Sequence, residues 1–256
     1  MSDPLASFKK LIKVLDTLLS PNGCDWDKKQ THQSLIPYLL EEVYEVIESI
    51  ENKDMKGLKE ELGDLMLHIL FQAKLASKEG YFDIQDSIEN ISSKLIKRHP
   101  DVFLDPDSQS DGNVSWEQSK KKEKNRDSIL DGVPLALPSL TRARRIQEKA
   151  SSVGFDWNDI VPIWAKIKEE LSELDEAIDT QKEEKIKDEM GDLLFSIVNL
   201  ARFMEIDPES SLRFAIRKFE NRFKKVEKKL EQDGKRMEDS NLEEMDLIWN
   251  KIKEEN

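Results

Sequence analysis

Acidic side chains recur in this 256-residue sequence in two compact patterns that could hold a cation. In each pattern two adjacent glutamates are followed by a third glutamate three residues later, and a Glu-x-x-Asp pair comes further along the chain. The two sets are Glu41, Glu42, Glu45, Glu61 and Asp64 in the first half, and Glu169, Glu170, Glu173, Glu189 and Asp192 in the second. Residues three apart project from one face of an α-helix. Each pattern therefore supplies two acidic helix faces.

The two acidic faces meet if each pattern folds as a helical hairpin. The segment 52–54 interrupts the apolar pattern between Glu45 and Glu61, which predicts two antiparallel helices joined by a short turn. Glu45 then lies level with Glu61, and Glu42 lies level with Asp64. Four converging carboxylates repel one another, so we expect a hard cation among them, Mg²⁺ first and Mn²⁺ second. A merely solvated acidic face is the alternative, but the same geometry occurs twice.

The hairpin itself is duplicated. Residues 38–75 align with 166–203 without a gap, at an offset of 128 positions and with 12 of 38 positions identical. The upstream segment GCDWD at 23–27 resembles GFDWN at 154–158. Apolar residues recur at helical spacing in both copies, and no strand-like alternation competes with them. The sequence therefore predicts an all-α fold built from two tandem helical units.

Further elements follow from the same patterns. We expect helices over about 84–98 and 209–232, a loop over 104–115, a short basic helix over 116–126 and a helix-breaking segment at 132–138. The predicted domains are an N-terminal unit at 1–115, a linker helix and loop at 116–138, and a C-terminal unit at 139–256. One two-helix hairpin cannot bury its apolar surface alone, so we also predict a homodimer in which like units pack together.

Composition limits the partners. The net charge of −13 argues against direct nucleic-acid binding, which depends on basic surfaces. No apolar run approaches the roughly 20 residues that span a bilayer, and no signal pattern precedes the first helix. The single cysteine, Cys24, excludes an internal disulfide and has no neighbouring base motif that would make it a nucleophile. A cytoplasmic protein is the expectation.

The acidic motifs resemble the signature of the MazG-type all-α nucleoside triphosphate pyrophosphohydrolases. CDWDKKQTHQSLIPYLLEEVYEV at 24–46 and KRHPDVF at 97–103 resemble the N-terminal MazG unit, and the tandem arrangement extends the resemblance over nearly the whole chain. The resemblance implies Mg²⁺-dependent hydrolysis of NTP or dNTP between the α- and β-phosphates, in nucleotide-pool housecleaning. It assigns Glu170, Glu173, Glu189 and Asp192 as metal ligands, with Glu42, Glu45, Glu61 and Asp64 as their counterparts. Glu169 and Glu41 would then position a second cation or orient the attacking water.

Basic and aromatic residues would complete such a site. Lys166 and Lys168 precede the second acidic motif by less than one turn, and Tyr38 and Leu40 replace them in the first copy. By family analogy the remaining substrate contacts are Lys218, Arg222, Trp249 and Lys253 in the C-terminal unit and Lys94 and Arg98 in the N-terminal unit. The N-terminal unit thus keeps the acidic set but loses part of the phosphate-binding set. We therefore expect the C-terminal unit to do most of the hydrolysis.

Several alternatives remain open at this stage. Trp26 and Trp157 could stack on a nucleobase, but a structural role in closing a core is preferred. His32, His68 and His99 have no repeated counterparts and are not expected to bind the cation. The fold could serve a different substrate, as in the related dimeric dUTPases or phosphoribosyl-ATP pyrophosphohydrolases. It could also be a non-catalytic helical module whose acidic faces bind a basic partner, but such a module has no need for two complete carboxylate sets.

Overall fold

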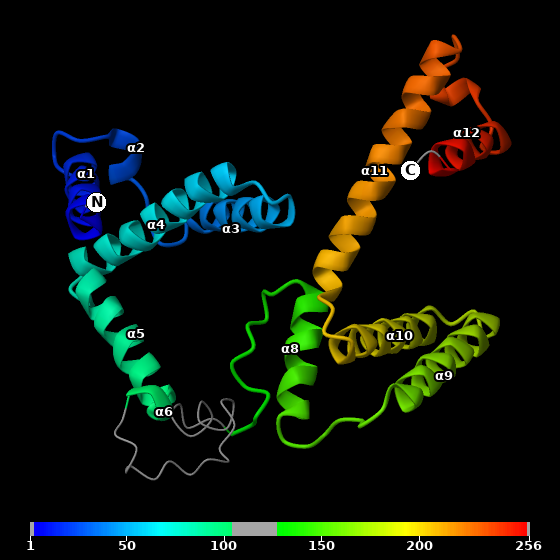
Figure 1. The fold of residues 1–256 in the computed structure, drawn as a ribbon, viewed down its shortest axis with the longest axis horizontal. Coiled ribbons are helices and arrows are strands. Elements are labelled where there is room, and N and C mark those ends of the chain that lie inside the picture. The colour runs from blue at the N-terminus through cyan, green and yellow to red at the C-terminus, as the bar shows by residue number, and fades with distance from the viewer. Residues whose placement is uncertain (1–2, 104–126, 255–256) are drawn as a thin grey trace. The chain divides into compact units, whose positions relative to one another are not determined.

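A computed structural model describes residues 3–103 and 127–254, and the chain divides into two compact units at 1–110 and 111–256 (Figure 1). All regular structure in the described ranges is helical, which confirms the predicted fold class. None of the described helices is both long and apolar enough to cross a membrane. The expected loop at 104–115 and basic helix at 116–126 lie outside the described residues, so the boundaries of the linker stay a prediction.

The N-terminal unit is arranged around one helical hairpin. Helix α3 (Ile36–Glu51) packs along α4 (Met55–Lys78), and α1 (Pro4–Leu18) and α5 (Ile84–Arg98) also contact α4. The short helices α2 (Asp25–Lys28) and α6 (Pro100–Phe103) complete it. In Figure 1 α5 runs away from the end of α4 rather than along the hairpin. The bounds of α5 confirm the helix predicted over 84–98.

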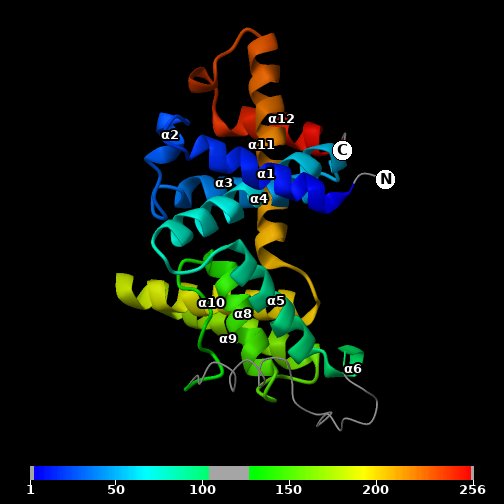
Figure 2. The same cartoon turned by 90° about the vertical axis from the view of Figure 1, so that its left-hand side faces the viewer.

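The C-terminal unit repeats this hairpin. Helix α9 (Ile160–Asp179) and α10 (Glu183–Phe203) run side by side in both views (Figures 1 and 2). Helix α8 (Ser139–Ser151) packs against α10 and against the long α11 (Pro208–Gln232). The 3₁₀ turn Met237–Asp239 leads into α12 (Leu242–Glu254), which packs on α11. The bounds of α11 match the predicted helix over 209–232 within one residue.

The hairpin turns show that the repeat extends to the backbone. Lys53 and Gln181 occupy equivalent positions, and both adopt positive φ angles, 57° and 53°. Each donates its backbone N–H to the equivalent carbonyl, to Ile50 at 3.1 Å and to Ile178 at 3.0 Å. A left-handed residue at this point ends one helix and reverses the chain within a few residues. The turns therefore hold both hairpins in the register that brings the acidic faces together.

The main clusters of buried apolar residues lie on different helices in the two units. The N-terminal core consists of Leu15, Leu35, Leu70 and Phe71, and partly buried side chains from α1, α4 and α5 pack against it. In the C-terminal unit, Val226, Leu230 and Ile252 form a cluster between the far part of α11 and α12. That cluster fastens α12 to α11 at a distance from the α9–α10 hairpin (Figure 1).

The preferred structural role for the two repeated tryptophans was wrong. Trp26 is 51% exposed and Trp157 is 42% exposed, so neither closes a core. Trp26 lies in the short helix α2, and Trp157 lies in the irregular segment before α9. Trp26 contacts Tyr38 edge-on, with ring centres 5.7 Å apart.

Candidate functional site

Three glutamates meet between α9 and α10. Ligand oxygens of Glu170, Glu173 and Glu189 all lie within 4.8 Å of one another. Glu170 is only 4% exposed, and its Oε2 atom is buried without a hydrogen-bond partner among the described residues. A buried carboxylate oxygen without a donor is costly unless a cation or proton reaches it. The donor set, all carboxylate oxygen, therefore fits a hard divalent cation.

The N-terminal hairpin holds the equivalent group. Glu42, Glu45 and Glu61 bring ligand oxygens within the same 4.8 Å. Sequence analysis predicted four carboxylates in each cluster, but the fourth residue, Asp64 or Asp192, lies beside the three glutamates and does not join them. Aspartate is one methylene shorter than glutamate, so its carboxylate stays closer to its own helix. Asp64 is still near enough to raise the pKa of Glu42.

The carboxyl groups perturb one another's protonation. Burial and then the neighbouring charges of Asp64, Glu45, Glu61 and Glu41 raise the pKa of Glu42 above its usual range. Desolvation and nearby carboxylates also raise the pKa of Glu61 and of Glu173. Raised carboxyl pKa values are the expected sign of anions held together without a counter-charge. A bound cation would therefore relieve the repulsion between carboxylates in both clusters.

Lys166 lies at the edge of the C-terminal cluster. Its Nζ atom is 2.7 Å from Glu169 Oε1 and 2.7 Å from Glu170 Oε1. Hydrogen bonds to these two carboxylates raise the pKa of Lys166 above its ordinary value. The lysine therefore stays protonated and presents one fixed positive charge beside the acidic cluster. Tyr38 stands at the equivalent position of the first copy.

A cavity of about 920 Å³ opens next to this cluster. Its walls come from α8, α9, α10, the loop before α9 and the segment 128–130, and they are mainly apolar. Lys166, Glu170 and Asp192 line it, so the acidic cluster and the cavity share one wall. Pockets for small molecules are typically of this size, with an apolar lining and a few polar groups. The cavity can receive the organic part of a ligand whose anionic part reaches the cluster.

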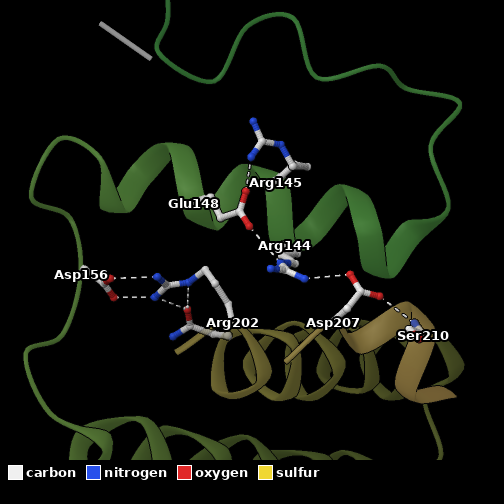
Figure 3. A network of polar contacts seen from close by, with 8 residues as sticks. Arg144, Arg145, Glu148, Asp156, Arg202, Asp207 and Ser210 are labelled. Atoms are coloured by element: carbon white, nitrogen blue, oxygen red, sulfur yellow. Dashed lines mark hydrogen bonds and ion pairs between the residues drawn. The ribbon is translucent and has the colours of Figure 1, made fainter. Parts of the chain in front are cut away.

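A network of hydrogen bonds and ion pairs connects the elements that form the wall of this cavity (Figure 3). Arg202 on α10 binds both carboxylate oxygens of Asp156, at 2.9 and 2.6 Å, and also donates to Oδ1 of Asn199 at 3.0 and 2.9 Å. Burial would raise the pKa of Asp156, but hydrogen bonds from Arg202 and Ser151 outweigh it and hold the pKa below its usual value. The bidentate pair fastens the loop before α9 to α10.

A second part of the network fixes α8. Arg144 donates to Asp207 at 2.8 Å and to Glu148 at 2.9 Å, and Glu148 also accepts from Arg145 (Figure 3). Asp207 caps the start of α11 by accepting from the backbone N–H of Ser210 at 2.7 Å. These contacts tie α8 to the junction of α10 and α11, and thereby hold α8 in place as one wall of the cavity.

Comparison with known proteins agrees with this geometry. A family model described as the MazG nucleotide pyrophosphohydrolase domain matches residues 30–103 and 162–227, which contain both acidic hairpins. The chain belongs to the MazG family. It is 48% identical to "Nucleoside triphosphate pyrophosphohydrolase/pyrophosphatase MazG" of Thermotoga maritima over 96% of this chain and 95% of that protein. It is 41% identical to "Nucleoside triphosphate pyrophosphohydrolase" of Escherichia coli K12, over 95% and 96% of the two chains.

A third relative shows the two MazG segments inside a longer protein. The chain is 45% identical to "Uncharacterized protein YabN" of Bacillus subtilis over 96% of this chain but only 52% of that protein. The family match leaves out α8 and α12. Part of the cavity wall therefore lies outside the two matched MazG segments.

The basic residues assigned by family analogy do not gather at the MazG acidic cluster of this chain. Lys218 lies 5.8 Å from the centre of the Phe214 ring, and the Arg222 guanidinium lies 6.0 Å from the centre of the Trp249 ring. Five of the predicted substrate contacts in the C-terminal unit do not line the cavity, namely Lys168, Lys218, Arg222, Trp249 and Lys253. In the N-terminal unit, Lys94 and Arg98 are carried by α5, which leaves the hairpin (Figure 1). Of the predicted cations, only Lys166 reaches the cluster.

The N-terminal MazG unit fills the region that is hollow in the C-terminal unit. Phe71, which occupies the position equivalent to Asn199, is 4% exposed and belongs to the core. His68, equivalent to Ser196, is also buried, with Nε2 4.0 Å from Glu42 Oε1. Burial lowers the pKa of His68, although the charge of Asp64 opposes this. Whether any histidine takes part in cation binding stays a prediction.

Sequence analysis missed four residues that shape the C-terminal cavity, namely Gln147, Asp156, Asn199 and Arg202. None belongs to an acidic motif. A signal was present in the repeat, because Asn199 and Arg202 lie three residues apart at positions where the first copy has Phe71 and Lys74. A polar residue in place of a core phenylalanine indicates a change from packing to binding.

Proposed function

We propose that this MazG protein is a Mg²⁺-dependent nucleoside triphosphate pyrophosphohydrolase. The reaction adds water across the anhydride between the α- and β-phosphates of NTP or dNTP, and it releases the nucleoside monophosphate and pyrophosphate. The relatives from Thermotoga maritima and Escherichia coli carry names that state this class of activity. Removal of unwanted nucleotides from the cytoplasmic pool is the role we propose, and the single cysteine suits that reducing compartment.

One observation carries the proposal. In the C-terminal unit a cluster of three glutamates, a lysine that stays charged and a largely apolar cavity share one wall. The acidic cluster by itself would also suit a module that binds a basic partner. Such a partner has no use for an adjoining cavity of about 920 Å³ with a lysine at its edge. A nucleoside triphosphate uses all three features.

The residues of the site have different roles in this reaction. Glu170, Glu173, Glu189 and Asp192 would hold Mg²⁺ or Mn²⁺, which supplies positive charge that neutralises phosphate oxygens. Lys166 adds a protein charge that stabilises the anionic transition state. Glu169 is exposed and held by Lys166, and we propose that it orients the attacking water, as Glu41 would in the first unit. Glu42, Glu45, Glu61 and Asp64 form the N-terminal cation site.

We also propose a homodimer that completes the site. Large apolar side chains on α10 and α11 are exposed in the single chain, among them Leu194, Ile197, Phe214 and Phe219. Packing of these faces between two copies would bury them. It would also allow α11 and α12 of a partner to bring Lys218, Arg222, Trp249 and Lys253 to the cavity. Light scattering should then give twice the 29.7 kDa mass of one chain, and a monomer mass would reject the dimer.

The test of the function is product analysis. The purified protein is incubated with a panel of NTPs and dNTPs, with Mg²⁺ and with a chelator, and phosphorus NMR identifies the products. We expect monophosphate and pyrophosphate with Mg²⁺ only. Release of diphosphate and orthophosphate would reject the proposed bond, turnover of dUTP alone would favour the dUTPase alternative, and no turnover would favour the interaction module.

A further inference from the structure

Two side-chain amides line the C-terminal cavity in addition to its charged residues. Gln147 on α8 and Asn199 on α10 both line the cavity and are only 7% and 8% exposed. Buried amides are normally hydrogen-bonded at both ends, because an unpaired polar atom in an apolar site costs free energy. Each of these two amides is bonded at one end only.

The bonds that exist fix how the amides point. Gln147 Nε2 donates to the backbone carbonyl of Phe195 at 2.8 Å, and its Oε1 is buried without a partner among the described residues. Asn199 Oδ1 accepts twice from Arg202, at 3.0 and 2.9 Å, so its NH₂ group is turned away from Arg202. That NH₂ group donates no hydrogen bond within the described part of the chain. Gln147 thus provides a buried acceptor without a partner, and Asn199 provides a donor that the described residues leave unbonded.

Of the two amides, Asn199 lies farther along the cavity from the acidic cluster. On α10, Asp192 and Asn199 are seven residues apart, which is two turns and about 10 Å along the helix. Across the hairpin, Asn199 lies level with Ile163, which is buried and apolar, and not with a charged residue. Arg202 is engaged by Asp156 and Asn199. At this level the wall carries the Asn199 amide, the apolar Ile163, and the charges of Arg202 and Asp156, which pair with each other.

We infer that Gln147 and Asn199 bind the hydrogen-bonding edge of the nucleobase, and that they determine base preference in the reaction proposed above. The inference rests on that proposed function. With the phosphates at Lys166 and Glu170, the nucleoside extends along the cavity toward Asn199. Asn199 donates to a ring nitrogen or carbonyl of the base, and Gln147 accepts from a neighbouring N–H. Arg202 and Asp156 are positioning residues that hold the Asn199 amide in this orientation.

The donor–acceptor pair predicts broad acceptance of bases. Adenine, cytosine, guanine and uracil each present a donor beside an acceptor on their pairing edge. Replacing the Asn199 donor by an acceptor should therefore change preference in a defined direction. Guanine alone has two adjacent donors on that edge, the ring N1–H and the 2-amino group. The variant Asn199→Asp should thus favour GTP, because both protein groups would then accept.

The experiment compares kcat/KM for four NTPs across four proteins: wild type, Asn199→Asp, Gln147→Met and the control Ser196→Ala, which also changes a cavity residue. Because a bidentate base contact is worth about 1–3 kcal/mol of discrimination, we expect Asn199→Asp to raise the ratio for GTP over the other three by about tenfold. Gln147→Met should lower kcat/KM for all NTPs through KM. Ser196→Ala should leave the ratios unchanged.

Inorganic tripolyphosphate has no base, so its inhibition constant reports on the phosphate contacts and not on the base contacts. It should stay at the wild-type value in all three variants, and circular dichroism should show unchanged melting. Unchanged base ratios in well-folded Asn199→Asp and Gln147→Met would overturn the inference, and so would an inhibition constant that rises in step with KM. If the wild type releases no pyrophosphate, the proposed function fails instead. In that case, calorimetry measures the affinity of the same proteins for the four Mg–NTPs. The base contact is then tested by whether the ratio of these affinities changes as predicted for kcat/KM.

Discussion

The two halves of this chain share a hairpin, a turn and an acidic cluster, yet they differ in what stands behind the cluster. In the C-terminal unit a cavity of about 920 Å³ adjoins Glu170, whereas in the N-terminal unit Phe71 and its core neighbours occupy the corresponding side of the hairpin. Lys166 is replaced by Tyr38 at the edge of the first cluster. A duplicated acidic cluster can thus be retained while the residues behind it change from cavity lining to core.

The residues behind the two hairpins differ in the same sense. Phe71 is 4% exposed and packs among Leu15, Leu35 and Leu70. The equivalent Asn199 has become a polar wall residue held by Arg202. In the first copy, Lys74 takes the position of Arg202 but pairs with Asp16 at 2.6 Å, and Asp25 pairs with Lys28. Among the described residues, no Arg–Asp pair fastens the corresponding loop of the first unit to α4, and a hydrogen bond between His32 and Gln72 connects them.

The largest expected difference between the units is in catalysis. Glu189→Ala should reduce kcat/KM by about a thousandfold or more, because loss of a cation ligand removes charge stabilisation of the transition state. Asp192→Ala should act in the same way. The matched changes Glu61→Ala and Asp64→Ala should leave most of the activity. Steady-state kinetics on variants with unchanged melting measures this, and equal losses in both units would show that the N-terminal unit is as active.

The second difference is in stability. Phe71→Ala removes a fully packed aromatic ring and should cost about 3–5 kcal/mol of unfolding free energy. Asn199→Ala, at the equivalent place in the other unit, should cost only about 1 kcal/mol, since it removes amide hydrogen bonds and no packed ring. Guanidinium unfolding, with hydrogen exchange of α4 and α10 to separate the units, makes the comparison. If Asn199→Ala lowered the unfolding free energy as much as Phe71→Ala, the wall of the C-terminal cavity would be part of a packed core as well.

The third difference concerns the phosphate contact. Lys166→Ala should weaken kcat/KM by about ten- to a hundredfold, as expected for loss of a hydrogen bond to a charged group of about 1.5–3 kcal/mol. Tyr38→Ala at the equivalent position should have little effect on turnover. The inhibition constant of tripolyphosphate should rise in Lys166→Ala alone. A similar rise in Tyr38→Ala would place substrate phosphates in the N-terminal unit too.

The smallest effect should be shared by both units. The folded-state pKa values of Glu42, Glu61 and Glu173 are raised, so the metal-free protein gains stability as pH falls through these values and loses it as pH rises through them. A divalent cation needs the deprotonated form. The increase in Tm on adding Mg²⁺ should therefore grow from mildly acidic to mildly alkaline pH. A pH-independent increase would argue against binding at these carboxylates.

The fold was predictable from the sequence because its signals are local. Apolar spacing, the turn residues and the repeat located the hairpins, and the constant register placed Glu45 beside Glu61. The same reasoning indicated four converging carboxylates, but side-chain length leaves Asp64 and Asp192 outside the closest group. Helical geometry specifies which face a residue occupies, and it does not specify how far the carboxylate reaches.

The cavity was not predictable in the same way. Its wall joins α8, α10 and the loop before α9, which are separated in the sequence and held together by Arg202 with Asp156. Trp157 was assigned to a core because aromatic residues near helix starts usually close one, whereas here the loop passes along the cavity and leaves the ring partly exposed. Contacts between distant segments decide such positions, and no spacing rule within one helix reveals them.

The site at which the nucleotide binds distinguishes the two units most directly. Isothermal titration calorimetry with Mg²⁺ and a nucleoside triphosphate analogue whose α–β bridge is a methylene group counts the sites without turnover. We predict one analogue per chain, with binding lost in Asn199→Phe, which places in the cavity the side chain that the N-terminal unit has at Phe71, and retained in the control Ser196→Ala. Two analogues per chain, or one that still binds to a folded Asn199→Phe protein, would contradict the assignment of the nucleotide to the C-terminal unit.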